Sequence, residues 1–187
     1  MKKNLKKLLA LCMTIVMCSM SGFVAYANAQ TNSSNFVVSI NVDKYNHMDD
    51  EELKNELRRM GLPKETVDEL MAIKEKIEAN PELYSARLRE FPSNPEIGDT
   101  YTIEYTLSQE EITTTQFIIE TLVALGAPVA AAITIGGLAM AFLLQHPNSK
   151  GLLITVEYYY GYNNDGFLAW NPRQVEFSDI PQEKAYE

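Results

Sequence analysis

Apolar and polar residues alternate in three segments of the chain, and this alternation predicts β-strands. Residues 36–42, 100–107 and 152–160 carry apolar side chains at every second position. A period of two places successive side chains on opposite faces of a sheet, so each segment is expected to have one buried face. A fourth strand is expected over 167–177, and the Asn171-Pro172 pair within it suits a bulge or an edge. These strands predict a short antiparallel sheet.

A helical period replaces the alternation in the region after the first strand. Asp49 or Asp50 can cap a first helix, and Gly61 follows where a left-handed terminator belongs. Pro63 and Pro81 each fit the first turn of a further helix. A small helical region of three short helices is therefore expected.

The third pattern is a long hydrophobic element at residues 108–146. Ser108 and Glu111 have the spacing of a capping box, which predicts a helix that begins near Gln109. From residue 121 to 145 a helix would extend about 37 Å, and the hydrocarbon core of a bilayer is about 30 Å thick. The stretch is uncharged, which predicts a membrane span over 121–145. The expected helix-packing positions within it are Gly126, Pro128, Ala132, Gly136, Gly137 and Ala141.

Two alternatives for this element stay open. A break at Gly126-Ala127-Pro128 would turn it into a helical hairpin buried in a protein core, which lets the flanking strands join one sheet. In the other alternative, its Ala- and Gly-rich composition resembles the hairpins of pore-forming bacteriocins, and residues 109–146 would act on membranes. The expected fold is α+β, with one long apolar helix, transmembrane or a buried hairpin, inserted between strands.

The first 29 residues have the features of a signal peptide. Four lysines precede an apolar segment at residues 8–17, and small residues suitable for cleavage follow near Ala27 and Ala29. An uncleaved N-terminal anchor is the alternative. Cys12 and Cys18 would be removed with the signal peptide, so no disulfide or thiolate metal site is expected in the processed chain.

The charge of the chain bears on its partners. The formal net charge is −9, and removal of the four lysines at the start leaves 12 basic against 25 acidic residues. Nucleic acid is not expected as a partner, because phosphate binding requires clustered Lys and Arg. A lipid bilayer, a protein partner or self-association through the apolar helix is expected instead.

Residues with catalytic chemistry are sparse in this sequence. His47 and His146 stand far apart, and neither lies in a triad or zinc pattern. No enzyme activity, metal or cofactor is therefore expected. Aromatic residues are dense near the C-terminus, and three explanations compete: sheet packing, an interfacial belt and a glycan-binding surface. The residues of that possible aromatic surface are Tyr158, Tyr160, Tyr162 and Trp170.

These patterns combine into a domain plan. We expect a signal peptide at 1–29, an extracytoplasmic helical region with flanking strands at 30–107, the hydrophobic helix at 108–146, and a C-terminal hairpin with a polar tail at 147–187. The predicted function is that of an exported, membrane-associated binding or interaction protein on the extracytoplasmic face of a Gram-positive-type cell membrane, or secreted. The alternative function is a secreted toxin or bacteriocin-type precursor acting through residues 109–146.

Overall fold

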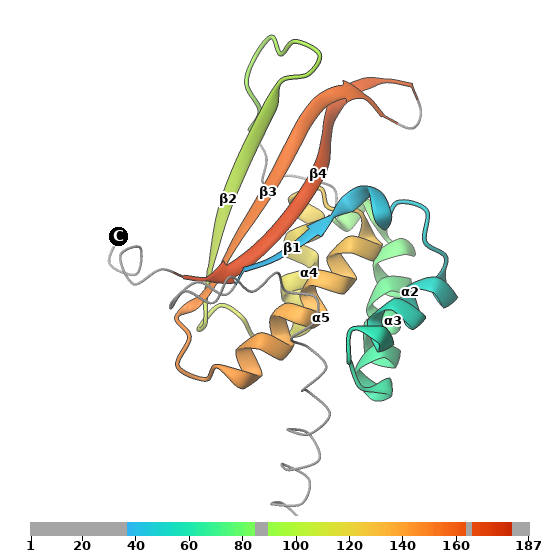
Figure 1. Cartoon of the computed structure of the whole chain (residues 1–187), viewed down its shortest axis with the longest axis vertical. Helices are drawn as coiled ribbons and strands as arrows, with labels where there is room; N and C mark the ends of the chain where they lie inside the picture. Colours follow the sequence, from blue (N-terminus) through green and yellow to red (C-terminus); the bar gives the residue numbers. More distant parts are fainter. Residues whose placement is uncertain (1–36, 85–89, 164–165, 181–187) are drawn as a thin grey trace, which may run out of the picture.

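A four-stranded antiparallel sheet in the order β1-β4-β3-β2 organises the computed structural model, which describes residues 37–84, 90–163 and 166–180 (Figure 1). The strands are β1 (Val37–Asn41), β2 (Thr100–Ser108), β3 (Gly151–Tyr162) and β4 (Leu168–Asp179). The α-helices are α2 (Asp50–Arg59), α3 (Lys64–Glu78), α4 (Thr115–Ala124) and α5 (Val129–Gln145), and the 3-10 helices are η2 (Val42–Lys44) and η3 (Pro81–Tyr84). The fold is thus α+β, and the predicted signal peptide at 1–29 lies outside the described residues.

The two faces of the sheet differ because the strands alternate as their sequences predict. Ile154 pairs with Phe177, and Ile40 pairs with Val175, and all four side chains are buried under the helices. Thr155 pairs with Glu176 on the opposite face, which is half-exposed. One apolar face therefore supports the core while the other meets solvent.

The prediction of a single membrane-spanning helix over 121–145 is wrong. The apolar element forms two helices, because α4 ends at Ala124 and α5 begins at Val129. At 1.5 Å per residue, the 17 residues of α5 extend only about 25 Å, less than the hydrocarbon core of about 30 Å. Within the described part of the chain, no helix combines the length and apolar character that a membrane crossing requires.

The break between the two helices is built from glycine and proline. Gly126 has a φ of 88°, in the left-handed region that glycine adopts without strain. The amide of Ala127 donates to the carbonyl of Leu122, and the amide of Gly126 donates to that of Val123, so α4 ends in a Schellman motif. Pro128 then precedes the first turn of α5. This is the break that the buried-hairpin alternative places at Gly126-Ala127-Pro128.

The start of α4 also differs from the prediction. Ser108 and Glu111 do bond to each other, since the Ser108 amide and hydroxyl both donate to the Glu111 carboxylate. They close a turn only, and the helix begins six residues later than Gln109. Thr114 has extended backbone and accepts from the amide of Phe117, so Thr114 is the N-cap that starts α4.

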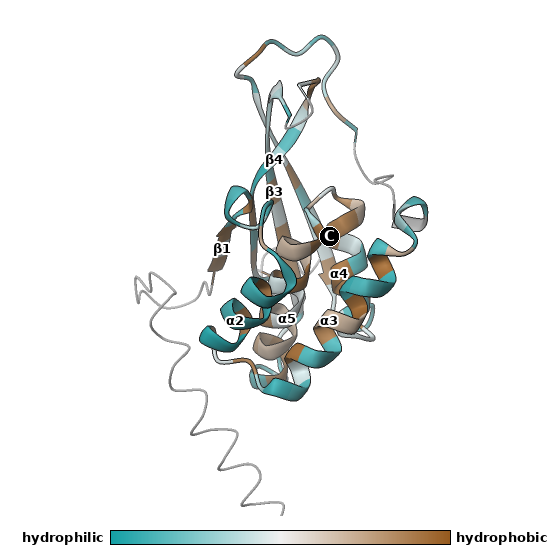
Figure 2. Ribbon diagram, turned by 90° about the vertical axis from the view of Figure 1, so that its right-hand side faces the viewer, coloured by the Kyte–Doolittle hydropathy of each residue, from teal (hydrophilic) through white to brown (hydrophobic). Residues whose placement is uncertain are grey.

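Helix α5 forms the centre of the core and contacts α4, α3 and β4. All residues from Ala130 to Leu143 except Met140 are buried. Figure 2 shows α5 mainly in pale to brown colours between α2 and α3, both of which carry hydrophilic teal segments. A helix that is apolar all round is typical of a membrane span or of the centre of a protein core, and here it is the second.

The small residues of α5 let its neighbours approach closely. A Cβ atom at Gly136 would lie 2.3 Å from Cγ1 of Ile119 on α4, and one at Gly137 would lie 2.7 Å from Cδ1 of Leu70 on α3. Ala132 and Ala141 are buried on the same helix. Gly136 and Gly137 therefore pack against helices of the same chain.

Candidate functional site

A β-bulge bends the hairpin of β3 and β4. Glu157 pairs with Gln174 and Tyr158 with Pro172, so β4 has one residue more than β3 at this point, Arg173. A bulge increases the local twist and redirects the strands beyond it. The outer ends of β3 and β4 extend past the helices and curve over the side of η2 (Figure 1).

A cleft of about 580 Å³ lies between this hairpin and the helical body. Its body wall consists of Asp43, Asn46, Gly126 and Pro128, from the η2 segment and from the link between α4 and α5. Its hairpin wall consists of Tyr159, Tyr162, Asn163, Asn171, Pro172 and Arg173. The volume falls in the range of small-ligand sites, about 300–1,000 Å³.

The hairpin wall is held in place by its own hydrogen bonds. The ring of Tyr159 lies against Gly161, where a Cβ atom would be 2.4 Å from the Tyr159 Cε2 atom. The Asn171 amide nitrogen donates to the carbonyls of Gly161 and Ala169 at 3.0 and 2.9 Å. The Asn163 side-chain oxygen accepts from the Phe167 amide at 2.8 Å. Aromatic and amide side chains on this wall are thus positioned before any ligand arrives.

A hydrogen bond of Tyr158 links the hairpin wall of the cleft to the body wall. The Tyr158 side chain is fully buried, and its hydroxyl donates to the carbonyl of Leu125 at the end of α4. Leu125 directly precedes Gly126 on the body wall. The separation of the hairpin from the α4–α5 link is therefore fixed by a bond inside the core.

The charges of the cleft nearly balance. Asp43 stands on the body wall, and Arg173 on the hairpin wall lies 3.9 Å from Glu157. The other polar groups of the lining are neutral amides and phenols. Such a lining suits an uncharged polar ligand, because it offers more neutral hydrogen-bonding groups and aromatic rings than charged side chains.

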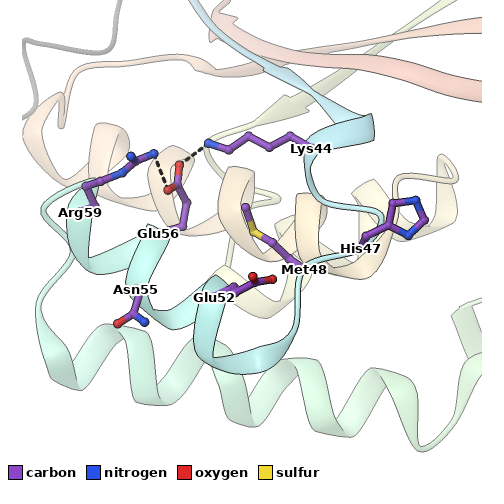
Figure 3. Close-up of a pocket in the computed structure, with 7 residues that line it drawn as sticks. All are labelled: Lys44, His47, Met48, Glu52, Asn55, Glu56 and Arg59. Carbon is purple, nitrogen blue, oxygen red and sulfur yellow. Dashed lines mark hydrogen bonds and ion pairs between the residues drawn. The ribbon is translucent and has the colours of Figure 1, made fainter.

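A second depression lies between the η2 turn and α2, and Figure 3 shows its lining. Glu56 lies at its base with a side chain only 8% exposed, and accepts from Lys44 Nζ and Arg59 Nη2, each at 2.5 Å. Burial raises the pKa of Glu56, but the hydrogen bonds and charges of Lys44 and Arg59 outweigh burial and hold it below its ordinary value. This ion triplet connects η2 to α2.

Tyr45 lies behind the same triplet. Burial and the neighbouring Glu56 charge raise the pKa of Tyr45 to about 12, so its hydroxyl stays protonated at neutral pH. Because the charged groups of the second depression interact with each other, we assign them to stability and take the hairpin cleft as the candidate site.

Of the four residues that the sequence grouped as one aromatic surface, three lie together and only Tyr162 is apart. The Tyr160 and Trp170 ring centroids are 5.4 Å apart. Tyr158 belongs to the same cluster, because its ring contacts Phe91. Tyr160 and Trp170 are half-buried, and the Trp170 ring stacks on Phe91 with centroids 5.4 Å apart. Tyr162 is 62% exposed and lines the cleft, together with Gly126 and Pro128. Three sequence-predicted residues therefore meet at the site, although they were expected in different roles.

Other cleft residues were not predicted from the sequence. Asp43 and Asn46 stand more than a hundred residues before the hairpin, and no local pattern connects them to it. Tyr159, Asn171 and Arg173 carried a weak signal, since a tyrosine-rich strand faces a predicted bulge. Among the described residues, no three His, Cys, Asp or Glu side chains come together as a metal ion would require.

Comparisons with protein-family models, with curated proteins and with solved structures give no match to this chain. The cleft therefore has to be interpreted from its own geometry and chemistry.

Proposed function

We propose that the protein is an exported, non-catalytic binding protein that holds a neutral polar glycan in the cleft between the β3–β4 hairpin and the helical body. The observation that supports this is the composition of the cleft, with tyrosine rings on one wall and asparagine amides on both. The site of action outside the cytoplasm rests on the predicted signal peptide.

Sugar chemistry matches such a lining. A sugar ring presents hydroxyl groups that both donate and accept. The Asn171 amide nitrogen already donates to two backbone carbonyls, so this residue offers a ligand its side-chain oxygen as an acceptor. Asn46 on the body wall can offer donors as well as an acceptor. The apolar C–H face of the ring packs on aromatic side chains, for which Tyr159 and Tyr162 stand on the hairpin wall. A charged ligand would gain less, because the cleft contributes one carboxylate and one guanidinium.

The earlier predictions of membrane contact rested on the span over 121–145. Contact with a bilayer stays a prediction, but α5 no longer supports it because this helix lies in the protein core. The toxin alternative also stays a prediction, and it would require α4 and α5 to leave the core that they form.

Titration with chitooligosaccharides tests the proposal. The whole chain is expressed in a Gram-positive host, and the exported product is titrated by calorimetry with N-acetylglucosamine oligomers. We expect saturable binding, and Tyr162→Ala should raise Kd at least about tenfold, because an aromatic anchor of a binding site is lost. Asn46→Ala on the opposite wall should weaken binding as well.

Phe167→Ala is the matched control for Tyr162→Ala. Phe167 is an aromatic residue of the same hairpin and is 70% exposed, but it does not line the cleft. Its substitution should leave Kd unchanged. The proposal fails if neither these oligomers nor isolated cell-wall glycan bind, or if Phe167→Ala weakens binding as much as Tyr162→Ala.

A further inference from the structure

The two edges of the sheet are unequally protected. The edge strand β1 has five residues and runs directly into the 3-10 helix η2. The other edge strand, β2, has nine residues, Thr-Tyr-Thr-Ile-Glu-Tyr-Thr-Leu-Ser, with no proline and no lysine. In the described part of the chain, β2 has a neighbouring strand on one side only. Long edges of this kind are usually blunted by charge, proline or bulges, because they readily pair with another chain.

The hydrogen-bonding pattern tells which residues of β2 face this open edge. The Gln109 amide donates to Lys150, and the Tyr160 amide donates to Asp99, so odd-numbered positions of β2 form the hydrogen-bonded pairs with β3. The backbone groups of Thr100, Thr102, Glu104 and Thr106 consequently point away from β3.

The side chains of β2 are also incompletely covered. Tyr101, Ile103 and Tyr105 belong to the helix-covered face but are only half-buried, whereas Thr102 and Glu104 on the other face are exposed. A further strand beside β2 would add cover to the three apolar side chains. A strand with the same alternation would serve this best.

We propose that this edge pairs with the β2 edge of a second copy, antiparallel and centred on Ile103, to join two sheets into one. The register follows by exclusion. A shift by one residue would place apolar side chains opposite polar ones on the wrong face. Centring on Glu104 would oppose two like charges, and centring on Thr102 would pair only residues 100–104. Centring on Tyr105 would need the Ser108 amide for pairing, but that amide already donates to the Glu111 carboxylate. Centring on Ile103 pairs residues 100–106 and sets Glu104 opposite Thr102 of the second copy.

This register suits both faces of the joined sheet. Ile103 meets Ile103 of the second copy, and Tyr101 meets Tyr105, which continues the apolar face across the junction. Four pairs with backbone groups on the open edge, with two hydrogen bonds each, supply about eight inter-chain bonds. A twofold axis perpendicular to the sheet keeps both helical layers on the same side.

Charge reversal on the exported product tests this register by analytical ultracentrifugation. We expect a dimer for the unmodified chain. Because Thr102 also lies opposite Glu157 of its own chain, the charge variants are made in a Glu157→Gln background. In that background, Thr102→Glu sets two glutamates opposite each other on both sides of the twofold axis and should raise the dimer Kd at least about tenfold. Adding Glu104→Lys to Thr102→Glu restores opposite charges and should return Kd to near the original value.

Two further variants separate edge pairing from folding. Thr102→Pro removes an amide that points to the open edge and should abolish the dimer, while Thr102→Ala keeps that amide and should leave it intact. Circular dichroism checks that each variant is folded. A monomeric unmodified chain, or a dimer indifferent to both Thr102→Glu and Thr102→Pro, would overturn the proposal. A dimer weakened by Thr102→Glu but not rescued by Glu104→Lys would overturn the register.

Discussion

Substituting the two adjacent glycines of α5 by alanine tests the packing of the core helix. Both substitutions add one methyl group to the same helix turn, and both gain about 1 kcal/mol of helix propensity. They differ in what the new Cβ meets. At position 136 it would lie 2.3 Å from Ile119 Cγ1 and 3.2 Å from Ile119 Cδ1, whereas at position 137 it meets the methyl ends of Leu70 and Leu62 at 2.7 and 3.2 Å.

The magnitudes follow from the stiffness of the neighbour. Cγ1 of a β-branched isoleucine cannot move without a χ1 rotation or a shift of α4, and Ile119 is fully buried. Overpacking costs about 1–3 kcal/mol, and an overlap as close as the one at position 136 belongs to the upper part of that range, about 2–3 kcal/mol. After the gain in propensity, Gly136→Ala should lower the free energy of unfolding by about 1–2 kcal/mol. A leucine methyl end moves more easily, so Gly137→Ala should stay within about 1 kcal/mol of the unmodified protein.

Urea unfolding followed by Trp170 fluorescence and by circular dichroism measures both effects. The background variant Ile119→Ala adds a control, because removal of the isoleucine removes the clash. In that background, Gly136→Ala keeps only its gain of about 1 kcal/mol in helix propensity. The double-mutant cycle should therefore give a coupling energy equal to the removed clash, about 2–3 kcal/mol. Equal stability of Gly136→Ala and Gly137→Ala, or an unchanged cost without Ile119, would refute the packing assigned to α5.

Three further predictions concern the residues that fix the cleft and the η2 turn. Tyr158→Phe should lower the free energy of unfolding by about 1–2 kcal/mol, because the Leu125 carbonyl loses a buried hydrogen bond; a loss near zero in urea unfolding would exclude that role. Gly126→Ala should lower the free energy of unfolding by about 1 kcal/mol through strain at positive φ, measured as a lowered thermal midpoint. Gly98→Ala is the control for strain alone, because Gly98 has a φ of 100° and a Cβ atom there would meet nothing within 4 Å. Glu56→Gln should lower the free energy of unfolding by about 1–2 kcal/mol near neutral pH, a value already reduced for the exposure of Lys44 and Arg59. Glu51→Gln, which breaks an exposed pair with Lys54, should have a smaller effect. Because the folded pKa of Glu56 is depressed, the unfolded chain binds more protons than the folded chain in acid. The stabilisation by the Glu56 carboxylate is therefore present above pH 4.5 and is lost as the pH falls through the folded pKa. A stability difference between Glu56→Gln and the unmodified protein that persists in acid would contradict this.

Local patterns predicted the elements that depend on local physics. Three of the four strands follow from alternation, and Asp49, one of the two caps that the sequence offered, starts α2; its capping box with Glu52 is a finding of the structure. The same reasoning misjudged the start of α4, because Ser108 and Glu111 bond to each other in a turn as readily as at a helix start. Hydropathy also could not distinguish a span from a core helix, since bilayer and protein core select the same apolar residues.

The candidate site was only partly within reach of the sequence. Tyr162, Gly126 and Pro128 could be singled out, as an aromatic residue and as a helix break, but their meeting in one cleft could not. Asp43 lies near them only because β1 pairs with β4 and carries η2 to the hairpin. That pairing joins residues more than a hundred positions apart, and no short-range signal encodes it.

The sequence by itself determined the strands, the two amphipathic helices α2 and α3, the acidic charge and the presence of an exceptionally apolar segment. These depend on side-chain periodicity and on residues within a few positions of one another. At the third predicted helix the described residues form only the 3-10 helix η3. Tertiary structure decided that the apolar segment breaks at Gly126 and packs α5 inside the protein, that the Arg173 bulge curves the hairpin over η2, and that β2 is left at an edge. Each of these outcomes depends on which distant surfaces exclude water together, a condition that only the assembled chain satisfies.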